Sequence, residues 1–258
     1  MYFDEDMLLD LRLNIMNKFV DFFVIVESKY THQGNVKDKK LNLSDFKKFK
    51  DKIIHIYNES KIETNNSWEQ ENFQRNLIIE GINNAKPDDY ILISDLDEIP
   101  NPKKLQNIYN KKYSVFNQSV FYYKFNLKNI SEINWYGTRC CKKKYLISPQ
   151  KLRNEKIKNY PFWRLDKIYH KKFNIIEDGG WHFTYIKTLS DIKKKIKSFA
   201  HTEFNKDKYL DDTYLKQKIN NGEDLFERDF KYKKIEVNKN NLPSYLVENV
   251  NYYSSWLL

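Results

Sequence analysis

Two carboxylates placed two residues apart, Asp95 and Asp97, are the strongest sign of chemistry in the sequence. They follow a short apolar run, Tyr90–Ile93, which is typical of a strand buried on both faces of a mostly parallel sheet, and the segment closes with Glu98 and Pro100. On an extended chain, residues i and i+2 point to the same side, so both carboxylates would face one ligand. Carboxylate oxygens suit Mg²⁺ or Mn²⁺, which is usually shared with substrate phosphates. The segment therefore predicts a metal–diphosphate site, and the alternative is a polar turn after a strand.

A second cluster runs from Glu177 to His182 and contains two neighbouring glycines, Gly179 and Gly180. The glycines would let the backbone approach a ligand closely. The imidazole of His182 could be a third metal ligand or a donor to a diphosphate. Asp178 could act as a general base on an acceptor hydroxyl. The alternative is a tight turn with a buried tryptophan and a histidine whose hydrogen bonds are satisfied.

Two further places hold candidate ligand contacts. Arg75 lies near the start of a predicted helix, where it could bind phosphate or form a structural ion pair with a carboxylate. Glu27 and Ser28 end a predicted strand, and loops that contact ligands commonly begin at such a point. These residues are therefore candidates for one binding site with the Asp-x-Asp segment.

The elements that must position these residues alternate between strands and helices in the first half of the chain, which is the order of an α/β sheet. Ser67 and Gln70 form a capping box at the start of one predicted helix, and Asn101-Pro102 starts another. In open sheets of this class, ligands bind beyond the carboxyl ends of the strands. The predicted strands cover 19–26, 52–57 and 90–93, and the predicted helices cover 4–17, 44–50, 67–85 and 101–111.

The second half is richer in aromatic residues and less regular. Residues 115–127 alternate in part and predict an antiparallel strand. A helix is predicted over 190–199, with a solvated face formed by its lysines, Lys193, Lys194, Lys195 and Lys197. Further strands are predicted over 135–137, 144–147, 163–164 and 168–170, and further helices over 149–158 and 206–220.

Composition places the chain among globular proteins. With 258 residues, 40% of them hydrophobic and 16% aromatic, it can bury a sizeable core, and we expect a single domain over 1–258. No apolar run reaches the roughly 18–20 residues that a membrane helix needs. The acidic start, residues 1–6, lacks the features of a signal peptide, so the sequence as given indicates a cytoplasmic or peripheral protein.

The net charge of +10 raises the question of an anionic partner. The excess is nearly all lysine, and only six residues are arginine, which nucleic-acid readers favour for bidentate contacts. We therefore expect no nucleic-acid partner and attribute the charge to a solvated surface, in a composition typical of an A/T-rich coding sequence of microbial or viral origin. The alternative is a basic, non-enzymatic protein that binds RNA or polysaccharide.

Five collinear motifs give the chain a likeness to a known family. They are Asp21–Ser28 with Thr31 and Gly34, Phe46–Ile54, Trp68-Glu69 with Phe73–Asn76, Ser94–Pro100, and Gly179–Phe183 with Ser198–Phe204. Together they cover most of the chain in order, and they resemble glycosyltransferase family 17. That family contains the β-1,4-mannosyl-glycoprotein β-1,4-N-acetylglucosaminyltransferases.

The resemblance implies a GT-A-like (Rossmann-like) mixed sheet flanked by helices, with an irregular, aromatic-rich C-terminal half. It implies a nucleotide-sugar-binding half over about 1–112 and an acceptor-side half over about 113–258. It also implies a metal-dependent inverting transfer of a sugar, GlcNAc in the characterised members, from a UDP-sugar to a glycan or glycoprotein acceptor. A microbial or viral surface glycan fits the composition of the chain as acceptor.

The resemblance also implies roles for single residues. Asp95 and Asp97 match the Asp-x-Asp motif of the family, which would hold Mn²⁺ or Mg²⁺ and the donor diphosphate, with His182 as a third contact. The residues expected to contact the donor are Glu27, Ser28, Arg75 and Asp95.

Inversion requires one catalytic base on the far side of the sugar from the leaving group. Asp178 is the first candidate, Glu177 the second and Glu203 the third, because they lie near the glycine motif or near the last motif. A different alternative, an Asp-x-Asp phosphotransferase, fits less well. Ile99 stands where the haloacid-dehalogenase pattern has Thr or Val, and that pattern belongs near the start of a chain.

Overall fold

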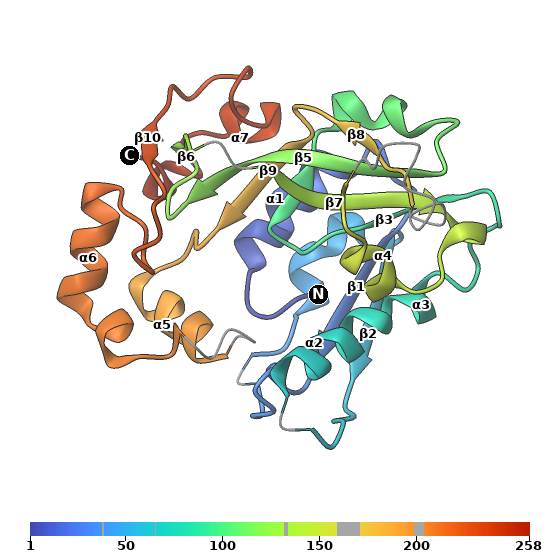
Figure 1. Ribbon diagram of the computed structural model, residues 1–258, viewed down its shortest axis with the longest axis horizontal. Helices are drawn as coiled ribbons and strands as arrows, with labels where there is room; N and C mark the ends of the chain where they lie inside the picture. The colour runs from blue at the N-terminus through green and yellow to red at the C-terminus, as the bar shows by residue number, and fades with distance from the viewer. Residues whose placement is uncertain (38, 65, 132–133, 159–170, 199–203) are drawn as a thin grey trace.

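The structure is a computed structural model that describes residues 1–37, 39–64, 66–131, 134–158, 171–198 and 204–258. Most of its sheet is arranged around one long strand, β5 (Tyr113–Tyr122), as Figure 1 shows. This strand pairs antiparallel with β6 and β7 and parallel with β8 and β9. The partners are β6 (Leu127–Asn129), β7 (Trp135–Lys142), β8 (Asn174–Ile176) and β9 (Gly180–Thr184).

The sheet is mixed, and the strand that leads to the Asp-x-Asp segment lies at one end of its order. That strand, β3 (Tyr90–Ile93), pairs antiparallel with β7, and β4 (Glu98–Pro100) pairs antiparallel with β9. At the other end, β10 (Tyr232–Lys234) pairs with β6. The α/β class is confirmed. The expected parallel pairing of 90–93 is wrong, because its partner in the ladder comes from the second half of the chain.

A separate two-stranded sheet contains the first strands of the chain. β1 (Phe23–Ser28) and β2 (Ile53–Asn58) are parallel, and a 3-10 helix over Leu43–Phe49 lies in their connection. The strand predicted over 19–26 begins instead at Phe23, because the preceding residues leave α1 in a turn where Phe19 is exposed. The predicted buried strand is otherwise confirmed, since five of its six residues are buried.

Helix α1 (Asp6–Met16) packs against the Asp-x-Asp segment. Its apolar residues, among them Leu8 and Leu11, are buried, as the sequence periodicity predicts. The same core cluster contains Leu96 and Ile99, which flank the second aspartate. The turn that carries the two aspartates is therefore anchored on α1 through its apolar side chains.

Helix α2 (Ser67–Asn76) starts differently from the capping box in the sequence. The N-cap is Asn66, whose side chain accepts a hydrogen bond from the N–H two residues later (3.0 Å), and Ser67 is already helical. The helix breaks and continues as the short α3 (Ile78–Gly81) instead of running to Ala85. Its buried residues are polar, in contrast to the apolar face expected, and they are Gln70, Gln74 and Arg75.

Two helices of the second half, α5 (Leu189–Ser198) and α6 (Asp212–Asn221), pack against the end of β5 through aromatic and aliphatic side chains. They lie at the opposite side of the molecule from α2 and β2 in Figure 1. The buried members of this cluster are Tyr122, Tyr123, Leu127, Ile192, Ile196, Tyr209, Leu215, Leu225 and Phe226. Among the described residues, no helix is both long enough and apolar enough to cross a membrane.

Shorter helices complete the structure. Asn101 caps a 3-10 helix over Pro102–Ile108, as predicted, by accepting from the N–H of Lys103 (3.1 Å). Residues 144–147, predicted as strand, contribute instead to a 3-10 helix over Lys143–Tyr145. The remaining helices are α4 (Pro149–Asn154), α7 (Ser244–Glu248) and the 3-10 turns Asp207–Leu210 and Ser254–Trp256. The strands predicted over 163–164 and 168–170 lie outside the described residues.

Candidate active site

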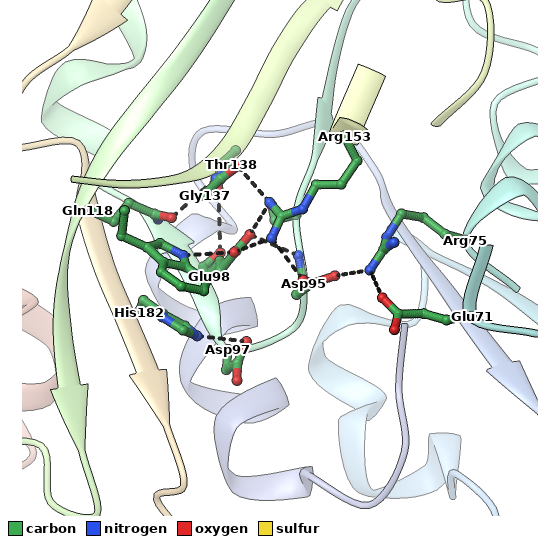
Figure 2. Close-up of polar contacts among 12 residues, drawn as sticks. Glu71, Arg75, Asp95, Asp97, Glu98, Gln118, Gly137, Thr138, Arg153 and His182 are labelled. Carbon is green, nitrogen blue, oxygen red and sulfur yellow. Dashed lines mark hydrogen bonds and ion pairs between the residues drawn. The ribbon is translucent and has the colours of Figure 1, made fainter. Parts of the chain in front are cut away.

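The acidic segment forms a tight turn between β3 and β4. The N–H of Glu98 donates to the carbonyl oxygen of Asp95 (3.1 Å), which closes the turn. The expectation of an extended segment with both aspartates on one side is therefore wrong. Figure 2 shows the result: Asp95 faces two arginines, whereas Asp97 faces His182.

Asp95 is held by guanidinium groups on both of its oxygens. Arg75 of α2 donates to Oδ1 (3.0 Å) and Arg153 of α4 donates to Oδ2 (2.9 Å). Arg75 is fixed in turn by Glu71 (2.6 Å) and Gln150 (2.5 Å). Burial alone would raise the pKa of Asp95, but the charges of Arg153 and Arg75 outweigh it and hold the pKa well below its ordinary 3.8. Asp95 is therefore a charged carboxylate with an arginine on each of its oxygens.

Glu98 is the buried centre of the site, with none of its surface exposed. Arg153 donates to both of its oxygens (2.5 and 2.8 Å), and the indole N–H of Trp135 donates to Oε1 (2.9 Å). The backbone N–H of Asp95 donates to Oε2 (3.1 Å), so this side chain also shapes the turn. A buried carboxylate needs such partners, because an unpaired charge in this position would be strongly destabilising.

Two more arginines stabilise this arrangement from outside. Arg12 of α1 donates to the carbonyl oxygen of Glu98 (2.6 Å) and to the hydroxyl of Ser94 (2.8 Å), so it links α1 to both sides of the turn. Arg139 of β7 donates to two carbonyl oxygens at the end of α4, those of Leu152 (2.7 Å) and Glu155 (2.6 Å). The helix that carries Arg153 is thereby fixed to the sheet.

Asp97 is held far more loosely. Among the described residues, its ion-pair partners are Nζ of Lys195, 3.4 Å from Oδ2, and Nε2 of His182, 3.6 Å from Oδ1, the histidine being charged only when it is protonated. Both contacts are longer than those of Asp95. Burial would raise the pKa of Asp97, but the charges of Lys195 and His182 outweigh it and leave the pKa below its ordinary value. Asp97 is therefore a charged carboxylate whose oxygens can turn toward a ligand.

His182 is oriented by a stacked indole. Its ring lies on Trp135, with ring centroids 4.2 Å apart and an angle of 16° between the planes. Its Nδ1 is buried and has no hydrogen-bond partner among the described residues. The β4–β9 ladder places the histidine opposite Glu98, and the next residue, Phe183, donates its N–H to the carbonyl oxygen of Asp97 (2.8 Å). Strand β9 thus brings the predicted pair of Asp97 and His182 together.

Glu27 and Ser28, predicted as donor contacts, are enclosed within the first sheet. Glu27 is fully buried and accepts hydrogen bonds from Lys37 (2.6 Å), the N–H of Leu41 (2.9 Å) and Nε2 of His55 (3.0 Å). Ser28 is also buried, and its hydroxyl accepts from the N–H of the second residue after it (3.1 Å). The structure gives both residues the role of ordering the loop after β1, in place of the expected ligand contact.

The predicted bases Asp178 and Glu177 lie at the other end of β9. From Phe183 back to its first residue, Gly180, the strand spans roughly 10 Å at about 3.3 Å per residue, and Asp178 lies two residues earlier in a turn. Glu177 accepts from the amide of Asn117 (2.8 Å) at that distant end. The structure therefore does not bring them together with Asp97, because they precede the first residue of β9, whereas Phe183, near its last residue, lies beside Asp97. The third candidate, Glu203, lies outside the described residues.

The two glycines at the start of β9, Gly179 and Gly180, allow close packing of the backbone, whereas the sequence indicated close approach of a ligand. A Cβ on Gly180, whose φ is +131°, would lie 2.2 Å from the carbonyl oxygen of Ile99. A Cβ on Gly179 would lie 2.7 Å from the carbonyl oxygen of Ile176. Both positions are therefore restricted to glycine by the close approach of β4 and of the β8–β9 turn.

Sequence reasoning missed several side chains that complete the site. Arg12 and Arg153 lack any local motif, although the scarcity of arginine made each one informative. Lys195 was assigned to a solvated face, but only 4% of its surface is exposed. Its spacing of three residues from Ile192 indicated the buried face, since residues three or four apart share one side of a helix.

The donor set can be tested against the expected divalent cation. Among the described ranges, no three or more His, Cys, Asp or Glu side chains gather closely enough to hold an ion alone. Asp97 and His182 converge, whereas Asp95 is engaged by its arginines. Magnesium-type ions are commonly bound by one or two protein ligands and completed by substrate phosphates. Asp97 with His182 fits an ion shared in this way, and Asp95 does not fit as a direct ligand.

Comparison with known proteins gives one match. A family model described as Glycosyltransferase family 17 matches residues 1–136, which is more than half of the chain. The match includes the acidic turn, Arg12, Arg75 and Trp135, and it ends before Arg153, His182 and Lys195. Searches of curated proteins and of solved structures found no match.

Proposed function

Because the chain belongs to glycosyltransferase family 17, we propose that it transfers a sugar, GlcNAc, from a UDP-sugar to a hydroxyl of a glycan acceptor. We propose further that the reaction depends on Mn²⁺ or Mg²⁺, inverts the anomeric carbon and takes place on a GT-A-like fold. The acceptor in this proposal is a surface glycan or glycoprotein. The family supports glycosyl transfer, the geometry of the acidic turn supports the metal ion, and the donor, the inversion and the fold type rest on the resemblance of the motifs.

One observation carries the proposal: the three carboxylates of the turn are held in different ways. Asp95 and Glu98 are bound by arginines at 2.5–3.0 Å, while the contacts of Asp97 are 3.4 and 3.6 Å long. Asp97 is thus the carboxylate available to a ligand, and the ion pairs of Asp95 and Glu98 hold the turn that carries it in place. A divalent ion bound there would neutralise the negative charge that develops on a departing diphosphate.

The other residues act by holding this carboxylate in place. Arg75 and Arg153 fix Asp95, and Glu98 orients both the turn and Trp135. Trp135 in turn stacks on His182 and keeps Nε2 of that ring directed at Asp97. Arg75 therefore acts on the donor through Asp95 in this proposal, since its guanidinium already binds Asp95, Glu71 and Gln150.

We do not propose Asp178 or Glu177 as the base, because both precede the start of β9, and roughly 10 Å of strand separates that start from Phe183, the residue beside Asp97. The inverting base has to lie closer to the sugar that an ion at Asp97 would position. The acceptor hydroxyl would then approach from the side of α5 and the end of β9, which border Asp97 in the second half of the chain.

The test is thermal unfolding with UDP, UDP-GlcNAc and other nucleotides, each with and without Mn²⁺. A ligand at 100 times its Kd stabilises the native state by about 2.7 kcal/mol, which is a clear shift in Tm. We expect stabilisation by UDP or UDP-GlcNAc that requires Mn²⁺ and is absent in Asp97→Asn. The matched control is Asp88→Asn, a carboxylate at the surface that pairs with Lys142 and Lys144.

The outcomes separate the parts of the proposal. Stabilisation by a different nucleotide would keep the site and change the donor. Equal stabilisation of the Asp97→Asn protein would overturn the metal position. A protein that responds to no nucleotide, but binds RNA or heparin in a salt-sensitive way, would support the basic-surface alternative instead.

A further inference from the structure

Lys195 occupies an unusual position for a lysine of an amphipathic helix. It lies on the buried face of α5 with Ile192 and Ile196, and only 4% of its surface is exposed. Its neighbours on the other faces, Lys194 and Lys197, are exposed. Burying an ammonium group is unfavourable unless anionic groups surround it, so the position calls for such groups.

One anionic group beside Lys195, the carboxylate of Asp97, belongs to the proposed donor site. The Nζ of Lys195 lies 3.4 Å from Oδ2 of Asp97 and 5.0 Å from the ring centroid of Tyr185. Its charge also lowers the pKa of Glu5, where it acts against burial and together with Lys187. Lys195 is therefore the residue that balances the charge of Asp97 from the side of α5.

An ion at Asp97 and the ammonium of Lys195 would compete for the same carboxylate. Two cations within about 4 Å of each other repel strongly at the effective dielectric of a protein surface. The flexible stem of lysine permits the ammonium to move, and lysine is a common point-charge partner for phosphate. The diphosphate of a nucleotide donor would provide such a partner at the moment when the ion takes Asp97.

We propose that Lys195 and a divalent cation exchange places at Asp97, and that the displaced ammonium binds the donor diphosphate. The inference rests on the proposed function for the presence of that diphosphate. It makes Lys195 the link between the two ligands: the ion binds weakly to the empty site, because it must displace the ammonium, and more tightly once the donor receives that ammonium. By linkage, the donor then also binds more tightly in the presence of the ion.

The experiment measures Mn²⁺ binding and UDP binding separately, by calorimetric titration of the full chain. Without UDP, Lys195→Met should bind Mn²⁺ about tenfold more tightly than the wild type, because the competing charge is absent. At saturating Mn²⁺, the same variant should bind UDP about tenfold more weakly, because one charged phosphate contact is lost. Lys195→Arg should keep most of the UDP affinity, and Lys197→Met, on an exposed face of α5, should match the wild type.

The opposite results would overturn the inference. It fails if Lys195→Met leaves both affinities unchanged, or weakens Mn²⁺ binding to the UDP-free protein. Tm is measured for every variant, and if Lys195→Met does not fold, Lys195→Gln, which keeps a polar tip, provides the same comparison. Asp97→Asn distinguishes the two proposals: if it binds Mn²⁺ like the wild type, the proposed function fails. If it loses Mn²⁺ while Lys195→Met behaves as wild type, only the role of Lys195 fails.

Discussion

Two carboxylates near strand ends, Glu27 at the end of β1 and Asp97 after β3, have very different surroundings. Glu27 is fully buried and accepts three hydrogen bonds of 2.6 to 3.0 Å. Asp97 keeps 15% of its side chain exposed, and its cationic neighbours are 3.4 and 3.6 Å away. Both positions are predicted from the sequence as candidate ligand contacts. The number and length of the polar contacts that a carboxylate already makes, more than its place in the fold, separate a structural group from one available to a ligand.

The largest expected effect is on stability, in Glu27→Gln. The substitution leaves the ammonium of Lys37, with only 4% of its side chain exposed, next to a neutral amide. Breaking a buried ion pair in this way costs about 3–5 kcal/mol. Urea unfolding should show that loss, whereas Asp97→Asn should show a smaller one, because its ion-pair contacts are 3.4 and 3.6 Å long. Equal losses in the two variants would abolish the distinction between the two carboxylates.

The next effect is the response to acid. The folded-state pKa values of Asp95 and Asp97 lie below their ordinary 3.8, and that of Glu27 lies below 4.5. Such carboxylates stabilise the fold above the unfolded-state pKa, and this stability is lost as the pH falls toward the folded-state pKa. We expect a nearly constant free energy of unfolding from pH 7 to about 5, then a decline below it of about 1.4 kcal/mol per pH unit for each carboxylate that takes up a proton on unfolding.

The comparison becomes sharper when unfolding is repeated at several pH values with Glu27→Gln. That variant should lose one carboxylate from the acid response and show a shallower decline below pH 5. If its slope equals that of the wild type, Glu27 does not carry the ion-pair role that its three hydrogen bonds indicate.

A smaller effect is expected from Trp135→Phe. The phenyl ring can still stack on His182, but the N–H that donates to Glu98 (2.9 Å) is lost. A hydrogen bond to a charged group contributes about 1.5–3 kcal/mol, so the variant should be destabilised by that amount. The control is Trp181→Phe, which loses a bond to a neutral carbonyl oxygen (2.8 Å) and should cost about 0.5–1.5 kcal/mol. A larger loss in the control would mean that the indole does not serve Glu98.

The smallest effect is expected from Asp178→Asn. Asp178 is exposed, and it precedes β9 at the end away from Asp97. Its substitution should leave kcat/KM for sugar transfer within about twofold of the wild type, since most surface substitutions away from a site change little. A loss of a hundredfold or more would return the catalytic base to the far end of β9 and would contradict the geometry described above.

Local patterns in the sequence predicted much of the fold. The helix over 6–16, the strand over 90–93 and the cap at Asn101 follow from periodicity and short-range hydrogen bonding. The antiparallel partner of β3 could not be predicted in this way, because pairing depends on β7, far along the chain. The cap of α2 moved from Ser67 to Asn66 because either side chain can serve as an N-cap, and local sequence does not decide between them.

The site was predicted in part. Asp97 and His182 meet as expected, but the sequence could not show that arginines from α2 and α4 would saturate Asp95. The sequence analysis placed Lys195 on a solvated face because it belongs to a run of lysines, although its spacing of three residues from the buried Ile192 indicated burial. In both cases, the missing information is which charges meet in three dimensions, and that depends on the tertiary fold.

The wide spacing of the site along the chain has a consequence for how the protein is made. Arg153 lies 58 residues after Asp95, and Lys195 lies 98 residues after Asp97. As the chain emerges from a ribosome, the acidic turn is therefore synthesised after Arg12 and Arg75 but well before Arg153 and Lys195. Contacts of such long range form slowly. The nascent chain must keep the turn open to water until α4 and α5 have been translated, so the site is completed only late in folding.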